Sequence, residues 1–315
     1  MKEDAQSTEL LEYGFELSNR EEVLTDDTPQ VLYHYTDIGG VIGIINDNAM
    51  RATDSRFMND RTDCIYGIML AKKILTNKML KEDDTEKAQY FRDCLEQLET
   101  ETSDVLSKKT FLICLSEKGN LLSQWRGYAK DTQGFSIGLK REELDRTRRR
   151  DEGWSVILKK IDYDEASQQQ TIVDILDELY SKGKELGEPI EEIAHVASVA
   201  LSYSSAFIKD PAYTEEAEWR IVLFSRRPGS SDYKLKFRMR RHTLIPYINF
   251  DFLPGETDQT KQEISKAEKC TLPISEIFCG PNADIETVDI SLPMFLNESG
   301  LEDLSLIKSG IPHRI

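Results

Sequence analysis

The stretch VLYHYTDIGGVIGIIND, residues 31–47, places a strand directly before a helix. Residues 31–36 have the Val, Tyr and Thr content of a strand. Asp37 can cap the helix that follows. The buried face of that helix is expected to be formed by Val41, Ile42, Ile44 and Ile45. Residues 31–47 therefore predict a strand followed directly by a helix.

Strand-forming segments recur along the rest of the sequence, recognised by runs of β-branched and aromatic residues. They lie at 110–117, 134–139, 154–164, 218–225, 233–242, 245–252 and 274–282. Helical spacing of apolar residues predicts helices near 64–80, 86–106, 170–182 and 190–208, and residues 120–129 form a short helix or turn. Residues 51–63 are expected to be an extended loop. Strands scattered along the chain, with helices inserted in blocks, predict an α+β fold.

The domain organisation expected from this pattern is a single domain over residues 31–285. Helical insertions interrupt it near 62–106 and 170–208. Residues 1–30 are acidic and polar and are expected to be a loosely attached lead-in, and residues 286–315 are expected to be a mixed C-terminal tail.

Charge and cysteine content exclude several classes of protein. The net charge of −17 opposes indiscriminate coating of DNA, although it leaves room for a local basic groove. The five cysteines include no CxxC pair, which suits neither a disulfide framework nor a zinc site. The first residues are acidic and lack the apolar centre of a signal peptide, and no apolar run reaches the ~20 residues that span a bilayer. We therefore expect a cytoplasmic protein that binds no membrane.

Several segments together resemble a bacterial family known as domain of unknown function, family twenty-nine seventy-one. They are YHYTDIGGVIGIINDNAMRATDSRFMND, TFLICLSE with LLSQWRGYAKDTQGFSIGL, FIKDPAYTEEAEWRIVLF, FRMRR with IPYINF, and IFCGPN. The opening strand is also similar to that of DNA-modifying toxins of the ADP-ribosyltransferase superfamily. This resemblance implies an ADP-ribosyltransferase-like fold, with a split mixed sheet as its core and inserted helix pairs.

The resemblance also implies a catalytic histidine at His34 and a catalytic glutamate at Glu218, with NAD as the substrate. Cleavage of NAD passes through an oxocarbenium-like state, which a carboxylate close to the ribose stabilises. An imidazole can bind ribose and an aromatic face can hold nicotinamide, so the chemistry needs no metal. Strand alternation places His34 on the face opposite Tyr33 and Tyr35. A half-buried structural histidine would fit the same position.

Glu216 and Glu218 stand two residues apart before a strand, so an extended chain would point both to the same side. This spacing resembles the paired glutamates of some ADP-ribosyltransferases, in which the first orients an acceptor. An acidic strand start of no function would have the same composition.

Further residues are candidates for binding the cofactor. They are Tyr35, Thr36, Arg56, Asn59, Ser116 and Tyr128. Arg56 and Asn59 could hold the pyrophosphate, because a guanidinium binds phosphate with two hydrogen bonds. Tyr128 could stack on a base, whereas Trp125 fits a core position better. The loop around Asn59 also fits a plain turn before the next helix.

A basic strand stands out in this acidic chain. Lys234, Lys236, Arg238 and Arg240 alternate with Tyr233, Leu235, Phe237 and Met239. The basic face could meet nucleic acid or the phosphates of NAD, or it could be a solvated face paired with carboxylates.

The function expected from these features is transfer of ADP-ribose from NAD to a protein or nucleic acid. The resemblance also implies the context of a toxin, a phage-defence effector or a host-interaction factor. Three alternatives remain. The first is an NAD glycohydrolase, in which water replaces the acceptor. The second is a non-catalytic module that binds nucleic acid or protein on the same scaffold, and the third is a different enzyme on that scaffold, which acts on RNA or another nucleotide without NAD.

Overall fold

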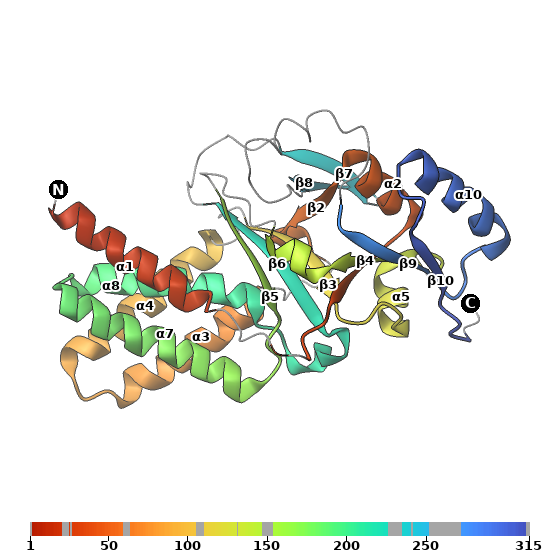
Figure 1. Ribbon diagram of the computed structural model, residues 1–315. Coiled ribbons are helices and arrows are strands. Elements are labelled where there is room, and N and C mark those ends of the chain that lie inside the picture. Colours follow the sequence, from red (N-terminus) through yellow and green to blue (C-terminus); the bar gives the residue numbers. More distant parts are fainter. Residues whose placement is uncertain are drawn as a thin grey trace. The chain divides into compact units, whose positions relative to one another are not determined.

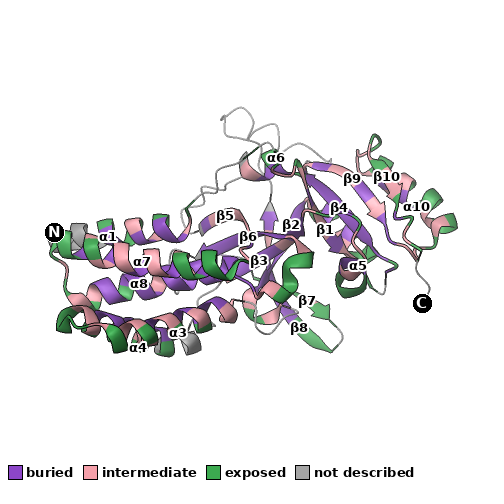
Figure 2. Ribbon diagram, turned by 90° about the horizontal axis from the view of Figure 1, so that it is seen from below, coloured by how far each residue is buried: buried purple, intermediate pink, exposed green. Residues whose placement is uncertain are grey.

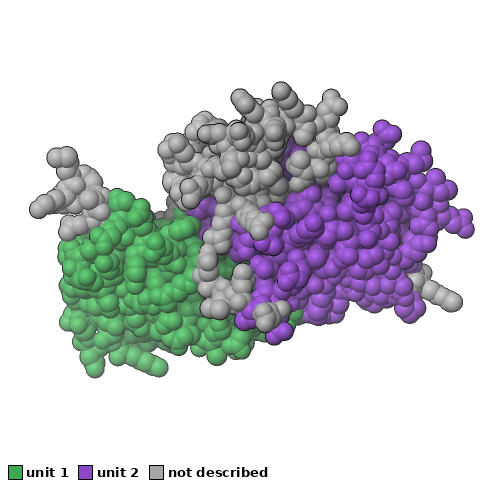
Figure 3. All heavy atoms as spheres, in the orientation of Figure 1, with its two compact units in different colours: residues 1–23, 55–110, 159–214 green, residues 24–54, 111–158, 215–315 purple. Residues whose placement is uncertain are grey.

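The structure is a computed structural model, and the chain divides into two compact units, which Figure 3 colours separately. The helical unit comprises residues 1–23, 55–110 and 159–214, and the sheet unit comprises residues 24–54, 111–158 and 215–315. Within them the structure describes residues 2–20, 25, 27–58, 64–104, 110–130, 132–146, 154–225, 235–240, 242–251 and 272–312.

The helical unit is built from helices that come from three separate stretches of sequence (Figure 1). Its α-helices are α1 (Lys2–Ser18), α3 (Ile65–Lys81), α4 (Thr85–Asp104), α7 (Glu165–Leu186) and α8 (Ile190–Ser204). The last four confirm the helices predicted from apolar spacing. Much of α8 is buried (Figure 2), and its small residues Ala194, Ala197 and Ala200 recur at helical spacing on the buried side.

Helix α1 is part of this unit and is not a loosely attached lead-in. Leu10 and Leu17 are buried in the core of the unit. The hydroxyl of Tyr13 donates a hydrogen bond of 3.0 Å to Glu178 on α7. The expectation for residues 1–30 was therefore wrong over the helix, because Leu10, Tyr13 and Leu17 recur every three or four residues and form an apolar stripe.

The sheet unit contains a mixed, ten-stranded sheet in its described part, with helices beside it. Its strands run in the order β10-β9-β4-β1-β3-β2-β8-β7, while β6 pairs with β3 and with β5. Their bounds are β1 (Val31–Thr36), β2 (Ala49–Asp54), β3 (Thr110–Ser116), β4 (Phe135–Lys140), β5 (Trp154–Lys160), β6 (Glu218–Ser225), β7 (Lys236–Arg240), β8 (Thr243–Asp251), β9 (Ile274–Cys279) and β10 (Ser305–Lys308). Strand β10 is parallel to β9, whereas β4 is antiparallel to both β1 and β9. The predicted α+β fold with a mixed sheet is confirmed.

Strand β3 is the point at which two arms of the sheet meet. It pairs with β1 at Ser116 and with β2 at Leu112 and Phe111, in both cases antiparallel. Cys114 lies between these two pairings. The arms β1-β4-β9 and β2-β8-β7 therefore diverge along β3.

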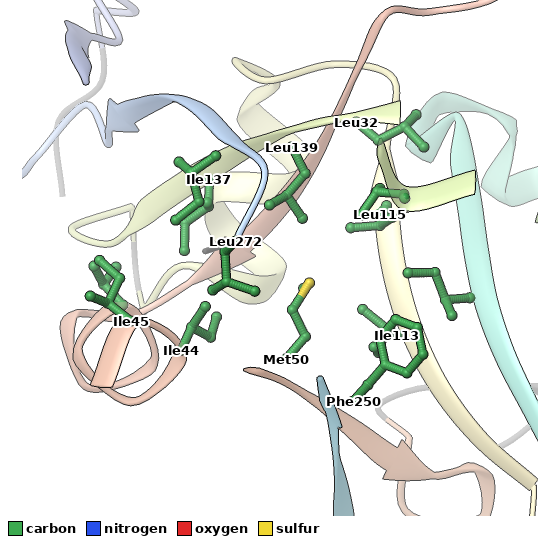
Figure 4. Packing of buried hydrophobic residues seen from close by; sticks show 14 of the residues in the cluster. Leu32, Ile44, Ile45, Met50, Ile113, Leu115, Ile137, Leu139, Phe250 and Leu272 are labelled. Atoms are coloured by element: carbon green, nitrogen blue, oxygen red, sulfur yellow. The ribbon is translucent and has the colours of Figure 1, made fainter. Parts of the chain in front are cut away.

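One apolar core lies under both arms of the sheet (Figure 4). Its labelled side chains come from β1, α2 (Ile38–Asp47), β2, β3, β4, β8 and the segment just before β9: Leu32, Ile44, Ile45, Met50, Ile113, Leu115, Ile137, Leu139, Phe250 and Leu272. Asp37 caps α2 as predicted, since its side chain accepts a hydrogen bond from the backbone N–H of Gly40. Val41, Ile44 and Ile45 are buried, but Ile42 is 41% exposed and does not belong to the buried face.

Two further expectations are corrected in the sheet unit. Residues 51–54, expected in a loop, belong to β2, because Arg51 and Thr53 alternate with buried Met50 and Ala52. The C-terminal segment is not a separate tail: α10 (Ile285–Glu298) packs on the core and β10 extends the sheet.

The remaining helices of the sheet unit are short. They are α5 (Leu122–Tyr128), which confirms the predicted short helix, and α6 (Arg141–Arg146). Among the helices of the described residues, none has the length and apolar character needed to cross a membrane.

Candidate functional site

His34 lies in the middle of β1, on the side opposite its two tyrosine neighbours, as predicted. The ring of Tyr33 meets Phe278 edge-on with centroids 5.9 Å apart. The ring of Tyr35 meets Trp125 in the same manner at 4.8 Å. His34 instead shares the side of Leu32, which belongs to the main core.

The imidazole of His34 sits where the two arms of the sheet diverge. Its Nδ1 lies 3.0 Å from the carbonyl oxygen of Cys114, on the part of β3 between its pairings with β1 and β2. A carbonyl can only accept, so Nδ1 carries the proton. Burial lowers the pKa of His34 and outweighs the hydrogen bond with Cys114, which raises it, and the charge of Arg238 lowers it further. The ring is therefore neutral, and its Nε2 is a hydrogen-bond acceptor.

Tyr35 and Thr36, candidates for binding the cofactor, make close contacts within the protein. The hydroxyl of Tyr35 donates to the carbonyl of Lys118 at 2.6 Å and accepts from the N–H of Leu121 at 3.0 Å. Burial raises the pKa of Tyr35 to about 12. Thr36 packs against Gly40, where an added Cβ would clash with the threonine side chain. Tyr35 thus fixes the loop before α5.

Ser116 and Tyr128 both reach Glu216, just before β6. The hydroxyl of Ser116 donates to the carbonyl of Glu216 at 2.7 Å. The hydroxyl of Tyr128, on α5, donates to Oε1 of Glu216 at 3.2 Å. Three candidate residues from different parts of the sequence therefore meet at the end of β3.

Glu218 forms a buried ion pair with Arg220 on the same strand. Nε of Arg220 lies 2.7 Å from Oε1, and Nη2 lies 3.0 Å from Oε2. The side chains are 0% and 6% exposed for Arg220 and Glu218 respectively. Trp219 and Ile221 enter the main core, so alternation directs Glu218 and Arg220 away from it. Both oxygens of Glu218 are held by one guanidinium.

The chain between the two glutamates is not extended. Ala217 has φ 45°, in the left-handed region that an L-residue rarely adopts, and Glu216 ends a short 3₁₀-helix, Pro211–Glu216. The expectation that Glu216 and Glu218 point to the same side does not hold here. Strained residues of this kind cluster at functional sites, and each costs about 1–3 kcal/mol.

The basic face of β7 is confirmed over its described residues. Lys236, Arg238 and Arg240 alternate with Phe237 and Met239 in a regular antiparallel register with β8. Lys236 and Arg240 are exposed, whereas Arg238 is half-buried. Its Nη2 donates to Oγ1 of Thr53 at 3.1 Å.

The remaining candidates lie in the helical unit or outside the described residues. Arg56 belongs to the helical unit, where its guanidinium lies 5.8 Å from the ring centroid of Phe57. Asn59 and Lys234 lie outside the described residues. The predicted pyrophosphate grip by Arg56 and Asn59 stays a prediction.

Two residues of interest were missed in the sequence. Arg220 partners Glu218, and the E-x-R spacing on a predicted strand was a usable signal, because residues i and i+2 share a face. Arg51 was missed because its segment was interpreted as a loop, although the alternation of Arg51 and Thr53 with Met50 and Ala52 is typical of a strand.

These features define an α+β protein whose mixed sheet divides at β3, with a neutral histidine at the division. Residues 124–221, from α5 to β6, match the family model described as "Protein of unknown function (DUF2971)". This match confirms the suspected family over that segment. No curated protein and no solved structure matches the chain.

Proposed function

We propose that this protein is an NAD-consuming enzyme of the ADP-ribosyltransferase type, which transfers ADP-ribose to a macromolecule. The observation that carries the proposal is the neutral imidazole of His34, fixed by Cys114 where the sheet divides. Its Nε2 can accept a hydrogen bond from a ribose hydroxyl. Arg238, whose charge acts on this ring, offers a donor for phosphate. A nucleotide presents both groups.

A carboxylate is the second requirement, and the start of β6 supplies two. In the proposal Glu218 is the group that stabilises the ribosyl cation, and Arg220 fixes its orientation through contacts with both carboxylate oxygens. Glu216, oriented by Tyr128, is more exposed and serves the acceptor.

The test is NAD turnover by the full-length protein in the presence of cell lysate, following nicotinamide release and transfer of label from NAD. Release with label transfer supports the transferase and identifies the acceptor as protein or nucleic acid. Release without transfer indicates an NAD glycohydrolase. No release, together with no rise in melting temperature on adding NAD, would refute the enzyme.

Matched substitutions assign the carboxylate. Glu218→Gln should abolish turnover while NAD still raises the melting temperature, and Glu216→Gln should retain nicotinamide release but lose label transfer. Loss of release in Glu216→Gln alone would reassign the cation-stabilising role to Glu216. Circular dichroism of each variant distinguishes a catalytic loss from an unfolded protein.

A binding module for nucleic acid is the second candidate, favoured by the exposed cations Lys236 and Arg240 on one strand face. Stabilisation by an oligonucleotide, without stabilisation by NAD, would favour it.

A further inference from the structure

Two arginine side chains of the sheet unit converge on one cross-strand pair. Thr53 of β2 lies opposite Tyr247 of β8. Arg238 reaches this pair from β7 through its 3.1 Å hydrogen bond to Thr53. Arg51 reaches it along β2, with its guanidinium carbon 5.3 Å from the ring centroid of Tyr247. The two cations therefore meet over Thr53 and Tyr247, both largely buried.

The charges around this pair are unfavourable for bringing cations together. Burial lowers the pKa of Arg238, and the neighbouring charges of Arg240 and Arg51 lower it further. On the other side, Asp37 acts on Arg238, and Asp47 lies 3.4 Å from Arg51. Guanidiniums remain charged in proteins, so the cluster holds three positive charges against two carboxylates. An anion would relieve this repulsion.

Both arginines also carry a donor to which no described residue offers an acceptor. Nε of Arg51 and Nε of Arg238 are buried and have no hydrogen-bond partner among the described residues. Asn249 lies opposite Arg51 on β8, and its Oδ1 is a buried acceptor that likewise has no hydrogen-bond partner among the described residues. Buried polar atoms without partners are costly, and they are a recognised sign of an unrecorded ligand, water or ion.

We infer that Arg51 and Arg238 form a phosphate-binding site whose ligand is the pyrophosphate of a dinucleotide. Nε and one Nη of a guanidinium can bind two phosphate oxygens at once, and both Nε atoms await such an acceptor. His34, on which Arg238 acts, would accept from the ribose next to that pyrophosphate. The side chain of Arg51 is 29% exposed, so part of it faces solvent, whereas a phosphate reaches the two buried Nε atoms only when the arginine side chains shift. The identity of the dinucleotide as NAD rests on the proposed function, whereas the phosphate site does not.

A nucleic-acid backbone is a poorer match for the same observations. Tracking a backbone requires exposed cations, and on this face these are Lys236 and Arg240. The donors to which no described residue offers an acceptor belong to the two partly buried arginines, and they suit a compact phosphate group.

The inference is tested by isothermal titration of the full chain with inorganic pyrophosphate at fixed ionic strength. Arg238→Gln and Arg51→Gln should each weaken binding about tenfold or more, the loss expected for a charge-assisted hydrogen bond. Lys236→Gln removes an exposed cation from the same face of β7 and should change affinity less than about twofold. Arg238→Lys keeps the charge but not the planar fork, so it should also bind more weakly than wild type.

Each outcome decides the inference. Absence of pyrophosphate binding by the wild type, or equal affinity in all variants with unchanged melting temperatures, would overturn it even if NAD turnover were found. Arginine-dependent binding without NAD turnover would leave this site established and refute the proposed function. A third outcome would replace the dinucleotide by nucleic acid as the ligand of this site. In it, a single-stranded oligonucleotide displaces pyrophosphate, and Lys236→Gln weakens the binding of both ligands as much as Arg238→Gln does. If Arg238→Gln lowered the melting temperature, its loss of binding could reflect unfolding, and the affinity of Arg51→Gln would then be compared with that of wild type instead.

Discussion

Replacing Arg220 with methionine should strongly destabilise the sheet unit. The Glu218 carboxylate is 6% exposed, and its two oxygens lie 2.7 and 3.0 Å from nitrogens of Arg220. Removing the guanidinium takes away the positive charge that binds both oxygens of this buried carboxylate, at a cost of about 3–5 kcal/mol. With a urea m-value of about 2 kcal/mol/M, the unfolding midpoint should fall by roughly 2 M.

Tryptophan fluorescence is the appropriate probe for this measurement. The chain's three tryptophans all belong to segments of the sheet unit, and the side chains of Trp125 and Trp219 are buried, so their emission follows the unfolding of that unit. The double variant Glu218→Met with Arg220→Met removes both charges at similar volume. It should recover most of the loss, since well-packed apolar replacements of buried ion pairs are often neutral. A midpoint shift below about 0.5 M for Arg220→Met, or a double variant less stable than it, would refute the reasoning.

Three other predictions concern stability. Folding lowers the pKa of His34, so the unfolded state binds the proton more readily, and wild type should lose stability relative to His34→Gln as the pH falls below about 6.5. Urea melts at several pH values measure this, and parallel pH profiles for the two proteins would contradict it. Gly119→Ala should lower the free energy of unfolding by about 1–3 kcal/mol because its Cβ would clash with an aromatic ring of β1, whereas Gly127→Ala, which has open space around it in helix α5, should raise it by about 0.5–1 kcal/mol. Equal unfolding midpoints of the two variants would count against both assignments. Leu10→Ala should cost about 2–5 kcal/mol and raise amide hydrogen exchange in α8, while Leu11→Ala, 41% exposed, should change little; equal effects would mean that α1 does not complete the helical core.

Much of the secondary structure could be predicted because it depends on patterns of neighbouring residues in the sequence. The strand at 31–36 and the strand at 218–225 were predicted with the bounds that the structure has. Both combine β-branched and aromatic residues with a clear turn or cap beside them. Helix α1 was missed because its sequence is strongly polar, and only three apolar residues mark the buried side.

What could not be predicted depends on contacts between distant residues. No local feature indicates that α1 shares a core with α7 and α8, or that β3 joins two arms of the sheet. The same holds for the site. The alternation of Arg238 with its neighbours was predictable, but its convergence with Arg51 depends on the pairing of β2, β8 and β7. The left-handed backbone at Ala217 was likewise hidden, since alanine gives no sign of it.

The three-segment construction of the helical unit has a consequence for synthesis on the ribosome. Helix α1 ends at Ser18 and packs on α8, which ends only at Ser204. At translation rates of about 5–20 residues per second, this gap of about 190 residues corresponds to roughly ten to forty seconds. During that interval Leu10 and Leu17 have no partner from α7 or α8 to cover them. On the nascent chain Leu10 and Leu17 are therefore accessible to chaperones until α7 and α8 have been made.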